Sequence, residues 1–181
     1  TTTIDAELTA GGVVRGTVTA EDGGAPLEDI SATLYNPHDG SYVTSGTTDG
    51  SGVYRLDSLA AGDYKVRFYD YDGNYLPEYY DDQPDVTSAD LVVVSAGMTT
   101  TANAELTPAG IIKGTITAEG SSDPLEGISA LLYDADDGSY VTSGGSDASG
   151  AFRTGSLVAG DYRLRFYDYD GNYLPEYYDD Q

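Results

Sequence analysis

The sequence predicts an all-β protein made of two tandem β-sandwiches. A shift of 98 residues aligns residues 12–83 with residues 110–181 without a gap, and 49 of the 72 aligned positions are identical. Within each copy, apolar and polar residues alternate in short segments, which is typical of half-buried antiparallel strands. Turn dipeptides separate these segments at intervals of about 8–12 residues, and no amphipathic helical pattern interrupts them. A duplicated two-sheet sandwich explains all three observations.

The alternation places the strand segments one after another along the first copy. Near the start, Thr3, Asp5 and Glu7 face outward, opposite an apolar face. We expect each segment to form a strand with one face on a core. The residues of the buried faces are, segment by segment, Ile4, Ala6 and Leu8; Val14, Gly16 and Val18; Tyr54 and Leu56; and Tyr64, Val66 and Phe68.

Asp-Gly pairs mark the turns between these segments. The side chain of Asp49 can accept hydrogen bonds from its own turn, and Gly52 stands where the chain needs a positive φ angle. Both residues are therefore expected to be structural. The pairs are Asp22-Gly23, Asp39-Gly40, Asp49-Gly50, Asp72-Gly73 and Asp137-Gly138.

The repeat allows two boundaries between the units. In the first, residues 1–106 form one sandwich, closed by strands at residues 89–95 and 99–106, and residues 107–181 form a second that lacks equivalents of these closing strands. In the alternative, residues 1–83 and 99–181 are the complete units. The sequence consists of one full period of 98 residues and 83 residues of the next, so we expect it to be part of a longer array.

The first boundary has a consequence for association. Residues 1–9 resemble residues 99–107, and they would be the last strand of a preceding unit. An open sheet edge in the second unit and a spare matching strand favour pairing between copies of the chain. The connection between the units, from Leu106 to Ile111, contains Pro108 and is too short for a free coil, so we expect the units to hold a fixed relation.

The composition excludes several classes of function. The chain has 8 Lys and Arg against 31 Asp and Glu, and its net charge of −23 repels phosphate backbones and anionic lipid. It has no cysteine, and its one histidine, His38, is replaced by Asp136 in the second copy. Its longest apolar run, Leu91–Val94, is far shorter than a membrane span. We expect no nucleic-acid partner, no membrane insertion and no catalytic activity.

Several motifs recur at the same spacing in both copies. They are Gly16-Thr17-Val18-Thr19, Pro26-Leu27, Thr48-Asp49-Gly50-Ser51-Gly52-Val53-Tyr54 and Leu59-Ala60-Ala61-Gly62-Asp63-Tyr64, and then Gly114-Thr115-Ile116-Thr117, Pro124-Leu125, Asp147-Ala148-Ser149-Gly150-Ala151-Phe152 and Leu157-Val158-Ala159-Gly160-Asp161-Tyr162. Over nearly all of both copies, this pattern resembles the carboxypeptidase regulatory-like domain. The resemblance implies a transthyretin-like, Ig-like Greek-key β-sandwich, akin to CnaB-like domains. It also implies a non-catalytic module that occurs in tandem on secreted bacterial proteins.

A segment rich in carboxylates is identical in the two copies, as Arg67–Gln83 and Arg165–Gln181. Its oxygen-bearing side chains are the ligand types that Ca²⁺ requires, although their spacing is not that of an EF-hand loop. The alternative is a solvated acidic turn that holds no ion. The candidate calcium ligands are Asp70, Asp72, Asn74, Glu78, Asp81, Asp168, Asp170, Asn172, Glu176 and Asp179.

The same segment is rich in tyrosine, and the whole chain has 17 Tyr, 3 Phe and no Trp. Tyrosine rings can stack on sugars while their hydroxyl groups hydrogen-bond to them. The alternative is that these rings cover the end of a sandwich or pack where repeats meet. The candidate glycan or interface residues are Tyr71, Tyr75, Tyr79, Tyr80, Tyr169, Tyr173, Tyr177 and Tyr178.

These observations favour a non-catalytic extracellular module, secreted or displayed on a cell surface. It would act as a stalk, spacer or adhesive element, stabilised by Ca²⁺ and associating with neighbouring repeats or with copies of itself by strand donation. The alternative is a carbohydrate-binding accessory domain of a secreted enzyme that degrades polysaccharide or peptide. A coplanar row of exposed tyrosines would favour the alternative, whereas buried tyrosines would favour the stalk.

Overall fold

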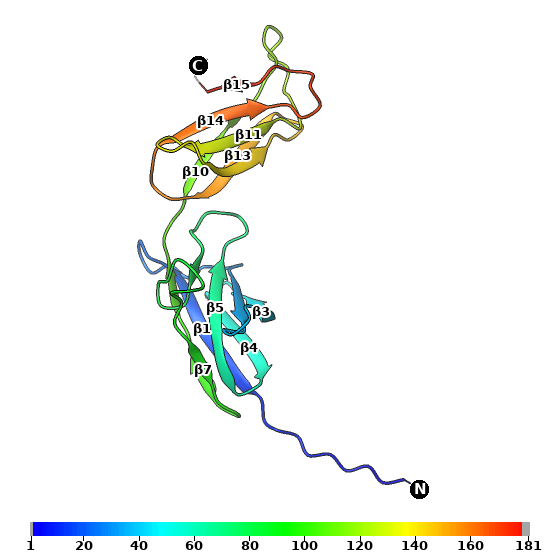
Figure 1. The fold of residues 1–181 in the computed structure, drawn as a ribbon, viewed down its shortest axis with the longest axis vertical. Helices are drawn as coiled ribbons and strands as arrows, with labels where there is room; N and C mark the ends of the chain where they lie inside the picture. Colours follow the sequence, from blue (N-terminus) through cyan, green and yellow to red (C-terminus); the bar gives the residue numbers. More distant parts are fainter. Residues whose placement is uncertain (1, 179–181) are drawn as a thin grey trace. The chain divides into compact units, whose positions relative to one another are not determined.

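The computed structural model describes residues 2–178, and every regular element in this part of the chain is a strand (Figure 1). None of the described segments is a helix long and apolar enough to cross a membrane. The strands form several sheets with a sandwich-like arrangement, so the all-β class expected from the alternation is confirmed. The chain divides into two compact units. The first runs through Tyr71 and includes Tyr75–Pro108, and the second consists of Asp72–Asn74 and the chain from Ala109 onward.

The first unit has two sheets, each with a long central strand. In one sheet, β4 lies antiparallel to β1, while β8 and β9 both pair with β1 in parallel. Its strands are β1 (Gly12–Ala20), β4 (Val53–Leu59), β8 (Thr99–Thr101) and β9 (Ala104–Leu106). The other sheet has the order β3-β2-β5-β6, with β7 also pairing with β5. Its strands are β2 (Ser31–Tyr35), β3 (Tyr42–Thr47), β5 (Gly62–Tyr69), β6 (Glu78–Tyr79) and β7 (Val92–Val94).

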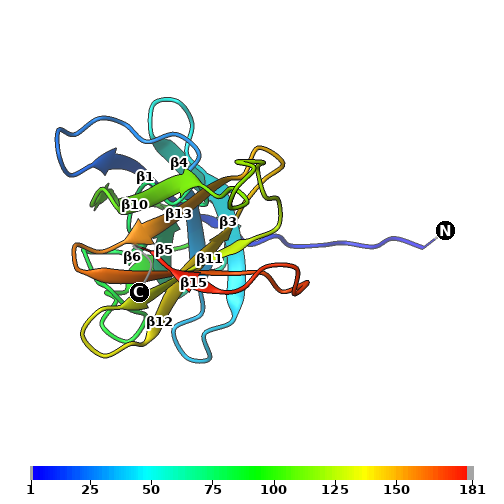
Figure 2. The ribbon, with the colours of Figure 1, turned by 90° about the horizontal axis from the view of Figure 1, so that it is seen from above.

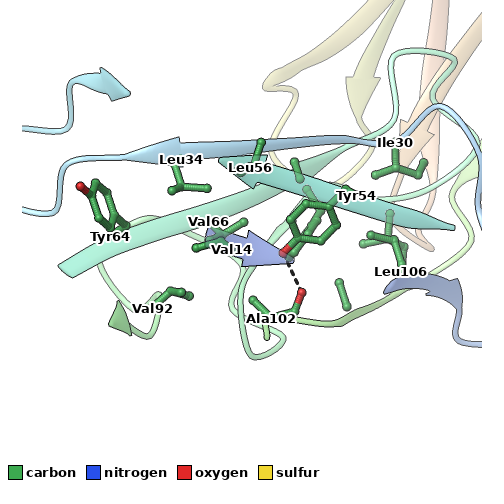
Figure 3. Close-up of a cluster of buried hydrophobic side chains, with 14 of the residues drawn as sticks. Val14, Ile30, Leu34, Tyr54, Leu56, Tyr64, Val66, Val92, Ala102 and Leu106 are labelled. Carbon is green, nitrogen blue, oxygen red and sulfur yellow. Dashed lines mark hydrogen bonds between the residues drawn. The ribbon is translucent and has the colours of Figure 1, made fainter. Parts of the chain in front are cut away.

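The core of the first unit lies between these sheets (Figure 3). Alternate residues of β1, such as Val14 and Val18, are fully buried, as period-two alternation requires. Two later strands also belong to this core, because β7 contributes Val92 and Val94 and β9 contributes Ala104 and Leu106. Tyr54 and Phe68 meet edge to face at its centre, with their ring centroids 5.7 Å apart.

Gly16 allows the backbone that joins β8 to β9 to come very close to β1. A Cβ atom at this position would overlap the carbonyl oxygen of Ala102. That same oxygen accepts a 2.6 Å hydrogen bond from the buried hydroxyl of Tyr54, drawn in Figure 3. Burial raises the pKa of Tyr54, so this hydroxyl stays a donor. Gly16 and the hydroxyl of Tyr54 together hold the closing segment, residues 99–106, against β1.

The turn before β4 has the structure that its sequence predicts. Gly52 has a φ angle of +72°, in the left-handed region that favours glycine. One carboxylate oxygen of Asp49 accepts hydrogen bonds from the backbone N–H groups of Ser51 and Val53, at 2.9 and 3.1 Å. The structural roles expected for Asp49 and Gly52 are therefore confirmed.

The second unit repeats the strand order of β1–β6. Its strands β10 and β13 form a two-stranded sheet, and β12-β11-β14-β15 form a four-stranded one. The bounds are β10 (Gly110–Thr115), β11 (Ser129–Asp134), β12 (Tyr140–Gly145), β13 (Ala151–Leu157), β14 (Tyr162–Tyr167) and β15 (Glu176–Tyr177). Among the described residues from Ala109 to Tyr178, no strand corresponds to β7, β8 or β9.

The prediction of a strand around Ile4, Ala6 and Leu8 is wrong for this structure. Residues 2–11 form no strand, and the segment leaves β1 as an extended chain in both views (Figures 1 and 2). The side chains of Ile4 and Leu8 are 87% and 95% exposed. The alternation is present, but a strand needs a neighbouring strand to pair its backbone hydrogen bonds, and no strand among the described residues pairs with residues 2–11.

Candidate functional site

The two acidic turns are organised around one buried carboxylate each. In the first unit, Asp70 follows β5, and its Oδ2 accepts a 3.1 Å hydrogen bond from the backbone N–H of Tyr75. In the second unit, the carboxylate of Asp168 accepts backbone hydrogen bonds from Asp170, Asn172 and Tyr173, at 2.8, 2.7 and 3.1 Å. These carboxylates therefore hold their own turns.

The hydrogen bonds change the acidity of Asp168. Its burial alone would raise the pKa, but the backbone N–H groups of Asp170, Asn172 and Tyr173 outweigh that effect and lower the pKa below its usual value. The group is therefore ionised at neutral pH, which is the state that accepts these hydrogen bonds best. An ionised carboxylate with both oxygens turned toward backbone donors has a structural role that needs no ion.

The other candidate ligands are dispersed. The side-chain oxygen of Asn74 accepts a 2.8 Å hydrogen bond from Arg153, whose guanidinium also donates to the backbone carbonyl of Asp72. Asp81 is exposed, and a side-chain hydrogen bond to Asp90 is the main cause of its raised pKa. Asp170, Asn172 and Glu176 are exposed. Asp179 lies outside the described residues. Within residues 2–178, no three acidic or histidine side chains are grouped closely enough to hold a metal ion.

Calcium binding by the two turns stays a prediction, and thermal melts test it. An ion that binds only the folded state would raise the free energy of unfolding by about 2.7 kcal/mol at a hundredfold excess over its Kd. We expect such an effect in millimolar CaCl₂ relative to EDTA, and its loss when Asp72 and Asp170 are replaced by Asn. The same melting temperature in CaCl₂ and in EDTA, at constant ionic strength, would contradict calcium binding. The carboxylates would then have only a turn-forming role.

The tyrosines of the same segment fall into two kinds of environment. Tyr71 and Tyr169 are 80% and 73% exposed, and each meets a neighbouring tyrosine edge to face, with interplanar angles of 74° and 68°. These two pairs are therefore not coplanar platforms for a sugar ring.

The remaining candidate tyrosines differ between the units. Tyr75 and Tyr80 pack against the core of the first unit, and Tyr79 is half-buried on β6. Tyr173, Tyr177 and Tyr178 of the second unit are exposed. Glycan binding by any of these rings stays a prediction.

The first unit also contains a group of carboxylates around Glu78, a predicted calcium ligand, that the sequence analysis did not bring together. Glu78 lies on β6, and its Oε1 atom is buried without a hydrogen-bond partner, alone in this respect among the buried side-chain oxygens and nitrogens of residues 2–178. Burial first, and then the charges of Asp82, Glu21 and Glu105, raise the pKa of Glu78 to about 7. Pairing of β9 with β1 places Glu105 where its charge acts on Glu78. No local pattern in the sequence predicts that pairing.

The second unit has an open groove beside β10, which has no neighbour corresponding to β8 or β9 among the described residues. One part of it, about 680 Å³, has a mixed lining that includes Ile116 and Phe166 as well as Glu119 and Asn172. A second part, about 760 Å³, shares Phe166 and adds Phe152 and Leu164. The first of the two boundaries expected from the repeat leaves this unit without equivalents of β7, β8 and β9, and none is present among the described residues from Ala109 to Tyr178.

Comparison with solved structures finds matches of low sequence identity and low structural similarity. The Bacillus anthracis TIE protein is 17% identical over 87% of this chain and 28% of its own, with a TM-score of 0.42. A streptococcal ancillary pilin is 17% identical over 86% of this chain and 53% of its own, with a TM-score of 0.45. The shaft pilin SpaA of Lactobacillus rhamnosus GG is 13% identical over 88% and 87%, with a TM-score of 0.40. The chain thus spans about a quarter and about half of the first two proteins.

The sequence itself identifies the family. No curated protein matches the chain. The family model of the carboxypeptidase regulatory-like domain matches residues 13–107, which begin in β1 and end directly after β9. This range contains every strand of the first unit, including the closing strands β7, β8 and β9. The chain therefore belongs to the carboxypeptidase regulatory-like domain family.

Proposed function

We propose that the chain is a non-catalytic module of a secreted or surface-displayed protein, in which two tandem β-sandwiches act as a stalk or spacer. The observation that carries this proposal is the connection between β9 and β10, which consists of Thr107, Pro108 and Ala109 alone. A connection this short, with a proline whose φ angle is fixed, suits a rigid spacer and not a flexible tether.

Two further observations support a structural role. Polar groups of the first unit form hydrogen bonds within its own turns and core, as Asp49 and Tyr54 illustrate. The net charge of −23 keeps such a module soluble and repels nucleic acid and anionic membranes. Adhesion would consist of contacts with neighbouring repeats or with copies of the chain, because part of the groove of the second unit offers apolar surface.

Small-angle X-ray scattering tests the spacer. We expect the scattering of the chain to be fitted by a narrow distribution of dimensions. Inserting a six-residue Gly-Ser segment between Thr107 and Pro108 should broaden that distribution, because a Gly-Ser linker behaves as a random coil. The same insertion between Asp39 and Gly40, in an exposed turn, is the matched control and should leave it narrow. A broad distribution in the unmodified chain would contradict the proposal.

A further inference from the structure

The outer face of the larger sheet of the first unit carries basic and aromatic side chains. Residues directly opposite each other on paired strands share a face of the sheet. Val66 and Phe68 of β5 are buried, so the residues between them face away from the core. One outward row across β3, β2, β5 and β6 consists of Ser45, Thr33, Arg67 and Tyr79, and a neighbouring row consists of Tyr42, Tyr35 and Lys65.

Arg67 stacks on a tyrosine ring and forms no ion pair with any described carboxylate. Its Cζ atom lies 4.7 Å from the centre of the Tyr69 ring, and Tyr71 meets that ring edge to face at 4.8 Å. Arg55, on the other sheet, instead pairs with Asp57 at 2.7 Å. Stacking uses the flat face of a guanidinium and leaves the N–H groups along its edge for a ligand.

Acidic side chains are nearly absent from this outer face, although the chain has 31 of them. At the outward positions of β2, β3, β5 and β6, the one carboxylate is Asp63. The same positions include Lys65, whose Nζ donates to the carbonyl of Val86, and Arg67. These strands therefore present more basic than acidic groups, in a chain whose net charge is −23.

The second unit repeats this arrangement on its four-stranded sheet. The Cζ atom of Arg165 lies 5.1 Å from the centre of the Tyr167 ring and 5.9 Å from that of Tyr177. The outward rows of β11, β12, β14 and β15 hold no carboxylate among the described residues, and they add Tyr133, Tyr140 and Arg163. Each unit thus has its own basic and aromatic face, complete within that unit.

From the unpaired, stacked arginines we infer that this face binds a polysaccharide containing uronic acid, with Arg67 and Arg165 each holding a sugar carboxylate. A guanidinium can donate two parallel hydrogen bonds to one carboxylate, in a geometry that a lysine cannot provide. The inference adds a ligand to the proposed surface module and goes beyond its role as a spacer.

The tyrosines beside the arginines favour a sugar over an acidic polypeptide. Tyr42 and Tyr140 are 62% and 58% exposed, and their hydroxyls form hydrogen bonds with those of Ser45 and Ser143, at 3.1 and 3.0 Å. A sugar ring has an apolar C–H face that packs on such rings and hydroxyls that bond to their polar ends. A carboxylate side chain of a polypeptide would use only the guanidinium.

The overall charge limits the kind of anionic polymer that fits. The net charge of −23 opposes the approach of any polyanion. At an ionic strength of 0.15 M this repulsion is screened beyond about 8 Å, whereas Arg67 acts on a ligand in contact with it. A polymer with isolated carboxylates therefore suits the face. Nucleic acid, with one charge per about 1.7 Å of duplex, does not.

The first experiment measures binding to polygalacturonate and to alginate by affinity electrophoresis. The buffer contains EDTA, so that calcium does not bridge carboxylates. Methyl-esterified polygalacturonate has the same sugar without the charge, and polyglutamate has the charge without the sugar. We expect the unmodified chain to bind the two polyuronates at least tenfold more tightly than either control polymer.

Three results of this experiment would overturn the inference. Absence of binding to both polyuronates would exclude the ligand class. Equal binding of the methyl ester would exclude the carboxylate as the recognised group, and equal binding of polyglutamate would favour an acidic polypeptide as the partner.

The second experiment assigns the binding to the arginines. Arg67→Gln combined with Arg165→Gln should weaken polygalacturonate binding at least tenfold. The matched control, Arg15→Gln with Lys113→Gln, removes two exposed charges at equivalent positions of β1 and β10 and should bind as the unmodified chain does. Thermal melts check that each variant is folded. Equal losses in the two double variants would overturn the role of the face.

A conservative variant separates hydrogen-bond geometry from charge. Arg67→Lys with Arg165→Lys keeps both charges without the planar group, and it should bind several-fold more weakly than the unmodified chain. Binding as tight as that of the unmodified chain would overturn the paired hydrogen bonds. None of these substitutions lies in the connection between the units, so the scattering test of the spacer is independent of this inference.

Discussion

Replacing Gly16 by alanine is expected to lower the free energy of unfolding of the first unit by about 3 kcal/mol or more. The added Cβ would overlap the backbone carbonyl of Ala102, and a backbone atom cannot turn aside as the end of a side chain can. The segment from β8 to β9 must therefore move away from β1, which breaks the hydrogen bond of Tyr54 and exposes Ala104 and Leu106 to water.

Gly114 provides the matched control, because it occupies the same position in the second unit. A Cβ added there meets the ring of Phe152, at 2.8 Å, and no backbone of a closing strand. The ring can tilt into the open groove, so Gly114→Ala should cost less than about 1.5 kcal/mol. Calorimetry gives the stabilities, and hydrogen exchange of the Ala102 amide reports on the closing segment directly. Equal losses in the two variants would contradict the role given to Gly16.

The strands that could be predicted from sequence are those whose alternation is matched by a partner in the fold. Val14, Tyr54 and Phe68 all fall on buried faces as the alternation predicted. The segment around Ile4 has the same alternation and forms no strand, because periodicity reports only which face would be buried. Whether a partner strand exists is a property of the whole fold, and a local pattern does not contain it.

The contacts of the candidate site residues could not be predicted from the sequence, for a related reason. The spacing of Asp70, Asp72 and Asn74 correctly marks a turn rich in oxygen ligands, but it does not reveal that Asp70 is used by the backbone of that turn. Contacts between distant residues were missed altogether. Glu21, Glu78 and Glu105 lie on different strands or turns, and only the parallel pairing of β9 with β1 and the placement of β6 bring their charges together.

Replacing Glu78 by glutamine is expected to stabilise the first unit at pH 8 and to remove part of its pH dependence. Burial and the charges of Asp82, Glu21 and Glu105 raise the pKa of Glu78 from 4.5 to about 7 in the folded protein. The folded state therefore binds more protons than the unfolded state between these two values. Because of this, the stabilising effect of protonation is complete below pH 4.5 and is lost as the pH rises toward 7.

The full shift corresponds to about 3 kcal/mol, and solvent screening of a side chain that is only half-buried reduces this to about 1–2 kcal/mol. Glutamine has nearly the shape of the protonated acid and does not ionise, so Glu78→Gln should gain that amount at pH 8 and little at pH 4.5. Glu176 is the counterpart in the second unit and is exposed, which makes Glu176→Gln the matched control for the loss of one charge. Urea unfolding at pH 4.5, 6 and 8 gives the three stabilities. The same gain at every pH, or the same gain in the control, would mean that the burial of Glu78 beside three other carboxylates does not set the pH dependence of this unit.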